Sequence, residues 1–119
     1  MARDVVFSQL KKYDINQKIL AELADLVSRN VMLSIVKKPM SVLDIATKNN
    51  IPISSVYQKL KTLEELSLVF VEKEIVDLDG KKTRLYRSMI KEASIRIEDK
   101  DPKIDLEPNK IKSSKNQVT

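Results

Sequence analysis

The chain has no cysteine and no histidine among its 119 residues. Without cysteine it has no disulfides, thiolate metal sites or cysteine nucleophiles. Without histidine it lacks the side chain that most often serves as a general acid or base near neutral pH. Any metal site would have to be built from carboxylates alone. We therefore expect a protein that is not an enzyme, with no catalytic residues, no metal and no cofactor.

Long apolar runs are missing too. No stretch reaches the roughly 18 apolar residues of a membrane span, and no apolar signal segment follows Met1. We expect a soluble cytoplasmic protein with no membrane partner. The length predicts about one domain. The hydrophobic fraction of 42% provides a core, but a small one, which favours association with a partner.

Glycine occurs once, at Gly80, between two stretches with β-branched, partly alternating side chains. Asp79-Gly80 predicts a two-residue hairpin turn, in which both turn positions need a positive φ. The first hairpin is expected over residues 69–90. Ile95 and Ile97, a DKDP turn, then Ile104 and Leu106 predict a second, shorter hairpin over 93–107. Residues 108–119 lack a core pattern and are expected to form a disordered basic tail.

The first 37 residues are rich in apolar positions at helical spacing. They predict a short helix over 4–12 and helical structure over 16–37, either continuous or broken near Ser28, and ended by Pro39. These positions exceed what one small domain can cover, so we expect the segment to form a dimer interface. Alternatively, these apolar residues pack against the second hairpin within one monomer. The expected interface residues are Phe7, Leu10, Ile19, Leu20, Leu23 and Val27.

Residues 41–66 read as two short amphipathic helices joined at a sharp corner. Ser41 is the expected N-cap of the first helix, and Pro52 stands near the start of the second. Ala46, Asn50 and Val56 have the spacing of a helix-turn-helix: a small residue, a left-handed residue and a β-branched core residue. Asparagine enters the left-handed region most readily after glycine. Such a corner holds the second helix out from the body, where it can enter a DNA major groove.

Charge is distributed in blocks. Residues 37–62 hold five lysines and one acid, and residues 79–91 hold five bases and one acid. Residues 63–78 and 92–107 are acidic, although the net charge is +5. Basic charge therefore accompanies the corner and the first hairpin, which favours a polyanionic partner for that part of the chain.

The candidate DNA contacts lie in these basic segments. Serine hydroxyls and helix N-terminal amides hold phosphate, a glutamine pairs with adenine, and a lysine reaches guanine or phosphate. A basic hairpin lies along phosphates or in the minor groove. The alternative is a solvated helix face, a tyrosine packed against the hairpin, and lysines that discourage edge pairing. The candidates are Lys48, Ser54, Ser55, Tyr57, Gln58 and Lys61 in the helices, and Lys81, Lys82 and Arg84 in the hairpin.

Three segments resemble the ArsR-like and related small winged-helix regulators of archaea and bacteria: LADLVSRNVMLSIV, NNIPISSVYQKLKTLEELSLV and DGKKTRLYRSM. The resemblance covers about residues 20–90. It implies an α+β, mainly α, winged helix-turn-helix, in which the first hairpin is the wing, and a sequence-specific double-stranded DNA-binding transcriptional regulator acting as a homodimer.

Two departures from the family pattern are informative. Metal-sensing members use cysteine and histidine, so metal sensing is not carried over, and no effector is indicated. Ser67 stands where the family usually has glycine. The alternative function is a winged-helix protein-interaction module in a transcription or chromatin complex.

Overall fold

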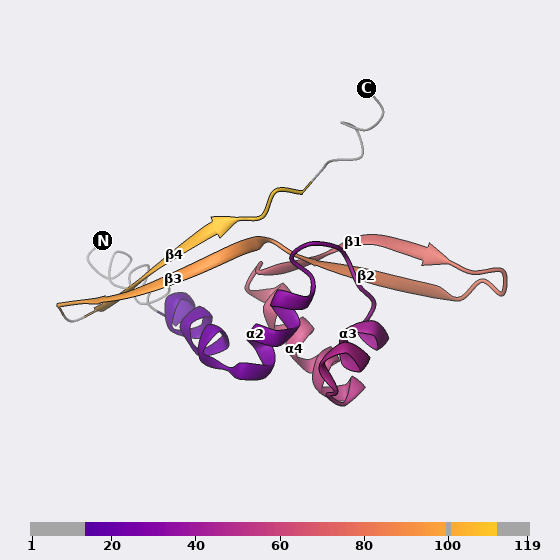
Figure 1. Ribbon diagram of the computed structural model, residues 1–119, viewed down its shortest axis with the longest axis horizontal. Coiled ribbons are helices and arrows are strands. Elements are labelled where there is room, and N and C mark those ends of the chain that lie inside the picture. Colours follow the sequence, from indigo (N-terminus) through magenta and orange to yellow (C-terminus); the bar gives the residue numbers. More distant parts are fainter. Residues whose placement is uncertain (1–13, 100, 112–119) are drawn as a thin grey trace, which may run out of the picture.

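The computed structural model describes residues 14–99 and 101–111 (Figure 1). A helix over 14–24 precedes three further helices, α2 (Leu26–Ser34), α3 (Val42–Asn49) and α4 (Ile53–Glu65). Four strands follow: β1 (Val69–Val76), β2 (Lys82–Ser88), β3 (Ile90–Glu98) and β4 (Asp101–Pro108). They pair as two antiparallel hairpins, β1–β2 and β3–β4. The α+β winged helix-turn-helix expected from the sequence is confirmed, including the second hairpin.

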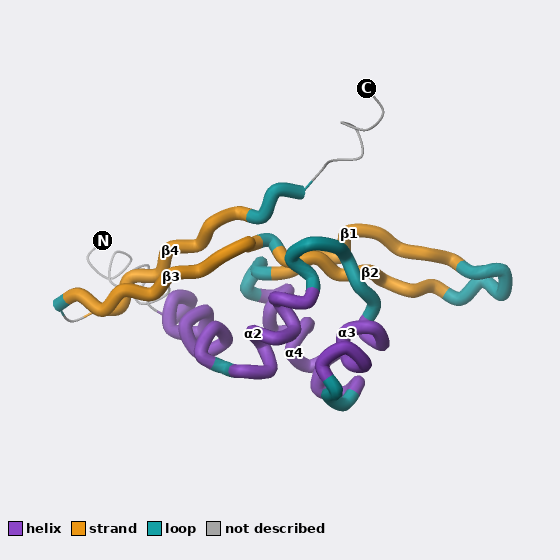
Figure 2. The backbone as a smooth tube through the Cα atoms, viewed as in Figure 1, coloured by secondary structure: helices purple, strands orange, loops and turns teal. Residues whose placement is uncertain are grey.

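Figure 2 shows the helices gathered beneath the two ribbons, which extend from the body in opposite directions. The core lies where α2, α3 and α4 meet the roots of both hairpins. Its fully buried apolar side chains come mainly from the three helices, and Leu68, Val69, Tyr86 and Ile90 add the hairpin roots. Those fully buried side chains are Val31, Ile35, Ile45, Val56, Leu60, Leu63 and Val69.

The N-terminal helical region is broken at Asp25, not at Ser28. The Asp25 carboxylate accepts a hydrogen bond from the Ser28 backbone N–H at 2.9 Å and so caps α2. Ser28 is buried and donates its hydroxyl to Glu22 Oε1 at 2.7 Å. The Ser28 amide, followed by Lys59, holds the pKa of Asp25 below its usual value. Of the two alternatives left open by the sequence, the helical region is therefore broken, and the break lies three residues before Ser28 because the Asp25 carboxylate is the cap.

The end of α2 also differs from the expectation. The helix ends at Ser34, before Pro39, and its C-cap is Ile35. The predicted helix over 4–12, which contains Phe7 and Leu10, lies outside the described residues.

The corner between α3 and α4 has the predicted construction. Ser41 caps α3 by accepting the Asp44 N–H at 3.1 Å. Asn50 is left-handed, at φ 53° and ψ 50°, and the Ile51 N–H donates to the Ala46 carbonyl at 3.1 Å. Ala46 and Val56 are both buried in the core, and their helices, α3 and α4, pack against each other. Pro52 occupies the N-cap of α4 instead of its first turn. The turn therefore needs no glycine.

A second left-handed residue ends α4. Ser67 has φ 62°, its N–H donates to the Glu64 carbonyl at 2.9 Å, and the Leu68 N–H donates to the Leu63 carbonyl at 2.8 Å. This pair of bonds is a Schellman C-cap, and its apolar partners Leu63 and Leu68 are both buried. Serine thus takes the backbone conformation that glycine would adopt most readily.

The tip of the wing differs from the predicted two-residue turn. Asp77 and Lys81 close a three-residue loop, because the Asp77 N–H donates to the Lys81 carbonyl and the Gly80 N–H to the Asp77 carbonyl, each at 3.0 Å. Gly80 has φ 81°, whereas Asp79 is not among the residues with positive φ. The Asp77 carboxylate accepts the N–H groups of Asp79 and Lys81 at 2.9 and 2.8 Å. An additional acceptor at Asp77 therefore favours the longer loop with one left-handed glycine.

The second hairpin is longer than expected. It starts at Ile90, directly after the wing, and β4 runs to Pro108. The Asn109 N–H donates to the Met89 carbonyl at 2.8 Å, and its side-chain amide donates to the carbonyls of Val36 and Ser88. The predicted tail boundary at Pro108 was wrong, because hydrogen bonds fix Asn109 to the body. Residues 112–119 lie outside the described part of the chain.

Candidate nucleic-acid interface

Helix α4 is fixed to the body by one face and presents the other to solvent. Val56, Leu60 and Leu63 recur at i, i+4 and i+7 and are at most 1% exposed. On the other side of the helix, the candidate residues Ser54, Tyr57, Gln58 and Lys61 are exposed and Ser55 is half-buried. The 3.6-residue helical period accounts for this division of the helix into two faces.

Hydrogen bonds and one salt bridge set the position of the wing. Met40 pairs with Tyr86 in an isolated bridge, with N–H to O distances of 3.1 and 2.8 Å, and this ties the segment before α3 to β2. The Arg87 guanidinium donates to the carbonyls of Val36 and Lys37 and lies 2.8 Å from Glu72. Arg87 is therefore an anchor for the wing root, although the sequence counts it in a basic block.

A cleft of about 510 Å³ separates the wing from α3 and α4. Tyr57 lines its helical side and is 59% exposed, so it is not packed away against the wing. Lys81, Lys82 and Arg84 line the opposite side. Alternate residues of β2 share one side of the ribbon, which is why Lys82, Arg84 and the buried Tyr86 occur together there. Four of the nine candidate residues, one on α4 and three on the wing, therefore line the same cleft.

Glu74 also lines this cleft, and the sequence did not single it out. It stands directly opposite Arg84 in the hairpin register, with 3.8 Å between its Oε2 and Arg84 Nε. A bulge between Val71 and Lys73 sets which β1 residues face the cleft. An acid therefore offsets part of the positive charge, and only the register of the folded hairpin reveals it.

Lys48 lies apart from the cleft. It lines a separate hollow with Lys37, Lys38 and Lys91, at the C-terminal end of α3. Lys59, by contrast, is directed to Asp25, with 3.2 Å between the charged atoms, and its side chain is 28% exposed. The lysines of the first basic block therefore serve different surfaces.

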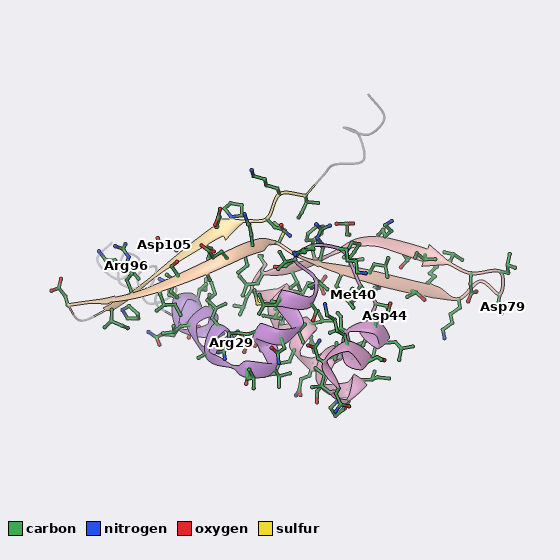
Figure 3. The ribbon with its side chains drawn as sticks, viewed as in Figure 1. Arg29, Met40, Asp44, Asp79, Arg96 and Asp105 are labelled. Carbon is green, nitrogen blue, oxygen red and sulfur yellow. The ribbon has the colours of Figure 1, made fainter. Side chains whose placement is uncertain are left out.

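Figure 3 shows Asp79 at the far end of the wing. The carboxylate of its neighbour Asp77 is engaged by two turn amides. The tip therefore carries acids as well as Lys81 and Lys82, and the concentration of positive charge lies along β2 behind the tip.

Within residues 14–99 and 101–111, no cluster of three or more histidine, cysteine, aspartate or glutamate side chains is placed to hold a metal ion. In the same part of the chain, no helix has the length and apolar character needed to cross a membrane.

The expected dimer residues are partly engaged in the protomer. Leu23 is buried in its core, and Ile19 and Val27 pack against that core. Leu20 is half-buried, while Phe7 and Leu10 lie outside the described residues. The dimer remains a prediction.

No protein-family model matches the sequence, and no curated protein sequence matches it. Among solved structures, the chain is similar to NolR from Sinorhizobium fredii, with a TM-score of 0.56 and 25% sequence identity. The match covers 68% of this chain and 75% of NolR. NolR is a winged-helix transcription regulator. The order of the helices and hairpins and this similarity together show that the chain has the winged-helix regulator fold.

Proposed function

We propose that the protein is a sequence-specific, double-stranded DNA-binding transcriptional regulator of the ArsR-like kind, which acts as a homodimer in the cytoplasm without enzymatic activity. Helix α4 enters the major groove, and the wing follows the backbone or minor groove. The observation that carries the proposal is the cleft in which the exposed Tyr57 of α4 and the basic wing residues Lys81, Lys82 and Arg84 line opposite sides.

The candidate residues of the helices and of the wing have different roles in this proposal. Gln58 pairs with the edge of an adenine, and Lys61 contacts guanine or phosphate. Ser54 and Ser55, in the first turn of α4, hold a backbone phosphate with their hydroxyls and with the Ser54 amide. Lys81, Lys82 and Arg84 supply contacts to the backbone that do not depend on sequence. Lys48 adds a backbone contact at the other end of α3.

A homodimer places two α4 helices on one duplex. Two-fold symmetry sets the recognition helices about 34–36 Å apart, one turn of DNA, so that they read a near-palindromic site. The similarity to a winged-helix regulator supports the regulatory role.

The second candidate is a winged-helix protein-interaction module. Two apolar side chains of the helix-turn-helix favour it, since Leu43 is 59% and Ile53 45% exposed. Glu74 within the cleft also reduces its attraction for phosphate. A protein partner would cover such a mixed surface.

The test is a selection of bound duplexes from random DNA, followed by affinity measurements at several salt concentrations. A regulator binds the selected site about 10³-fold or more tightly than a scrambled duplex, and its log affinity falls linearly with log salt. Enrichment of no sequence, together with an affinity that salt does not change, would reject DNA reading in favour of the protein-interaction module.

A further inference from the structure

The second hairpin has one apolar face and one charged face. Residues opposite each other in an antiparallel pair point to the same side. The pairs Ala93 with Leu106, Ile95 with Ile104, and Ile97 with Pro102 therefore form one continuous apolar strip. The intervening pairs carry the ionic groups: Glu92 with Glu107, Ser94 with Asp105, and Arg96 with Lys103. Figure 3 shows Arg96 and Asp105 close together on this ribbon, and their charged atoms are 3.5 Å apart.

Only part of the apolar strip is covered within the protomer. Ala93 and Ile104 pack against the core cluster. Leu106 is 37%, Ile95 43% and Ile97 77% exposed, so exposure on β3 rises from Ile95 to Ile97, towards the tip. A two-stranded ribbon is marginally stable without such cover, and a long uncovered apolar strand is prone to association. The strip therefore has the properties of an interface.

Charge and position indicate what covers it. The segment 92–107 holds six acids and three bases, so it repels nucleic acid and anionic lipid surfaces. The strip itself contains no charged side chain. The ribbon also extends from the body on the side opposite the wing (Figure 1). A protein surface of matching apolar character fits these properties, and covering the strip leaves the DNA cleft open.

We propose that this apolar strip on β3–β4 is buried against the same strip of a second copy of the chain. An uncharged apolar surface is complementary to itself, as a two-fold contact requires. This inference rests on the homodimer of the proposed function and assigns its main contact to the second hairpin. Leu23 is buried in the protomer core, and Ile19 and Val27 pack against it, so these three residues of the expected N-terminal interface already have contacts within the protomer. The two wings then lie at the outer ends of the dimer.

The first test is the solution mass of the full chain and of Ile97→Glu, measured by ultracentrifugation over a range of concentrations. The wild type is expected to be a dimer at micromolar concentration, and Ile97→Glu to raise the dimer dissociation constant at least tenfold. The matched control is Ile75→Glu on the wing, where the isoleucine is 48% exposed and also stands on a strand. The control should leave the dissociation constant unchanged.

Two outcomes would overturn the interface. One is a wild type that is monomeric at micromolar concentration. The other is an Ile97→Glu variant with the wild-type dissociation constant. If that variant lowers the melting temperature without changing the mass, residues of the same chain cover the strip. Because Ile97 is 77% exposed in the protomer, the substitution itself should not prevent folding.

A second test uses the absence of cysteine, because a single introduced cysteine is labelled uniquely. Spin labels on Ile97→Cys are expected to give a shorter distance between subunits than labels on Leu78→Cys at the wing tip. The reverse order would overturn the contact. If the protein forms a dimer with this order of distances but does not prefer the duplex selected from random DNA, the proposed function is rejected and the interface is supported. A monomeric Ile97→Glu that binds a half-site would support both.

Discussion

The wing and the second hairpin are both antiparallel ribbons of seven- to nine-residue strands, and each has one bulge close to the body. Their faces differ in chemistry. Along β2, alternate residues place Lys82, Arg84 and Tyr86 on the side of the cleft between the wing and α4. Along β3, alternate residues place Ala93, Ile95 and Ile97 on the apolar strip. The same kind of backbone thus carries cations along the cleft on the wing and an apolar strip on the second hairpin.

The largest effect is expected from the wing lysines. Each phosphate contact contributes about 0.9 to the slope of log affinity against log salt. The double variant Lys81→Ala with Lys82→Ala should therefore lower that slope by about 2. It should also lower the affinity at 0.15 M salt about 30-fold, on every DNA sequence. Fluorescence anisotropy at several salt concentrations measures both.

The control for the wing variant removes the same charge from the other hairpin, with Arg96→Ala and Lys103→Ala. It should leave the slope unchanged. Equal losses from both double variants would mean that net charge, and not the wing, sets the affinity.

The next effect concerns base reading by α4. Gln58→Ala should weaken binding to the preferred site by about 1–3 kcal/mol and relax the preference at one base position. The exposed residue Glu65, seven positions further along the same helix, serves as the control. Competition between the selected duplex and single-base variants measures the change. A uniform loss on all sequences would show that Gln58 does not contact bases.

A smaller effect, of opposite sign, is expected at Glu74. Glu74→Gln removes the acid opposite Arg84 and should raise DNA affinity about fivefold at 0.15 M salt, the scale of one unit charge in the salt-dependent part of binding. Glu92→Gln removes the same charge from the second hairpin and should change nothing. If Glu74→Gln weakens binding instead, the carboxylate itself contacts DNA, for example by accepting a cytosine amino group.

The smallest effect is a change in stability at two serines, Ser67 before the wing and Ser94 within β3. Ser67 is left-handed, which costs an L-residue about 1–2 kcal/mol. Because glycine loses about 0.5–1 kcal/mol of additional backbone entropy on folding, Ser67→Gly should stabilise the protein by roughly 0.5–1 kcal/mol. Ser94→Gly, on an exposed strand position of β3, should destabilise it by a similar amount. Urea unfolding gives both values. Loss of stability in Ser67→Gly would mean that the hydroxyl contributes more than the backbone conformation costs.

The sequence predicted those parts of the fold that depend on local spacing. Ala46, Asn50 and Val56 identify the corner because each position has one backbone or packing requirement that few residue types meet. The alternation around Gly80 identifies the wing for a similar reason. At the N-terminal break, Asp25 and Ser28 are both capping residues, and local propensity does not choose between them. The choice depends on Glu22, which accepts the Ser28 hydroxyl, and on Lys59, which pairs with Asp25.

The cleft was predicted less completely than the fold. The exposed residues of α4 follow from helical period, but Glu74 enters the cleft through the register of the wing and its bulge. Arg87 belongs to a basic block in the sequence, yet its guanidinium donates to the carbonyls of Val36 and Lys37, just after α2. Charge blocks therefore located the basic elements, whereas tertiary hydrogen bonds decide which cations face the cleft.

The central claim is that the wing binds DNA and the second hairpin does not. Amide hydrogen exchange of the full chain, with and without the selected duplex, tests this claim most directly. DNA binding at the cleft predicts added protection in α4 and in the wing from Asp77 to Arg84, with the exchange of Ala93 to Leu106 unchanged by DNA. Added protection confined to the second hairpin, with none in α4 or the wing, would contradict it.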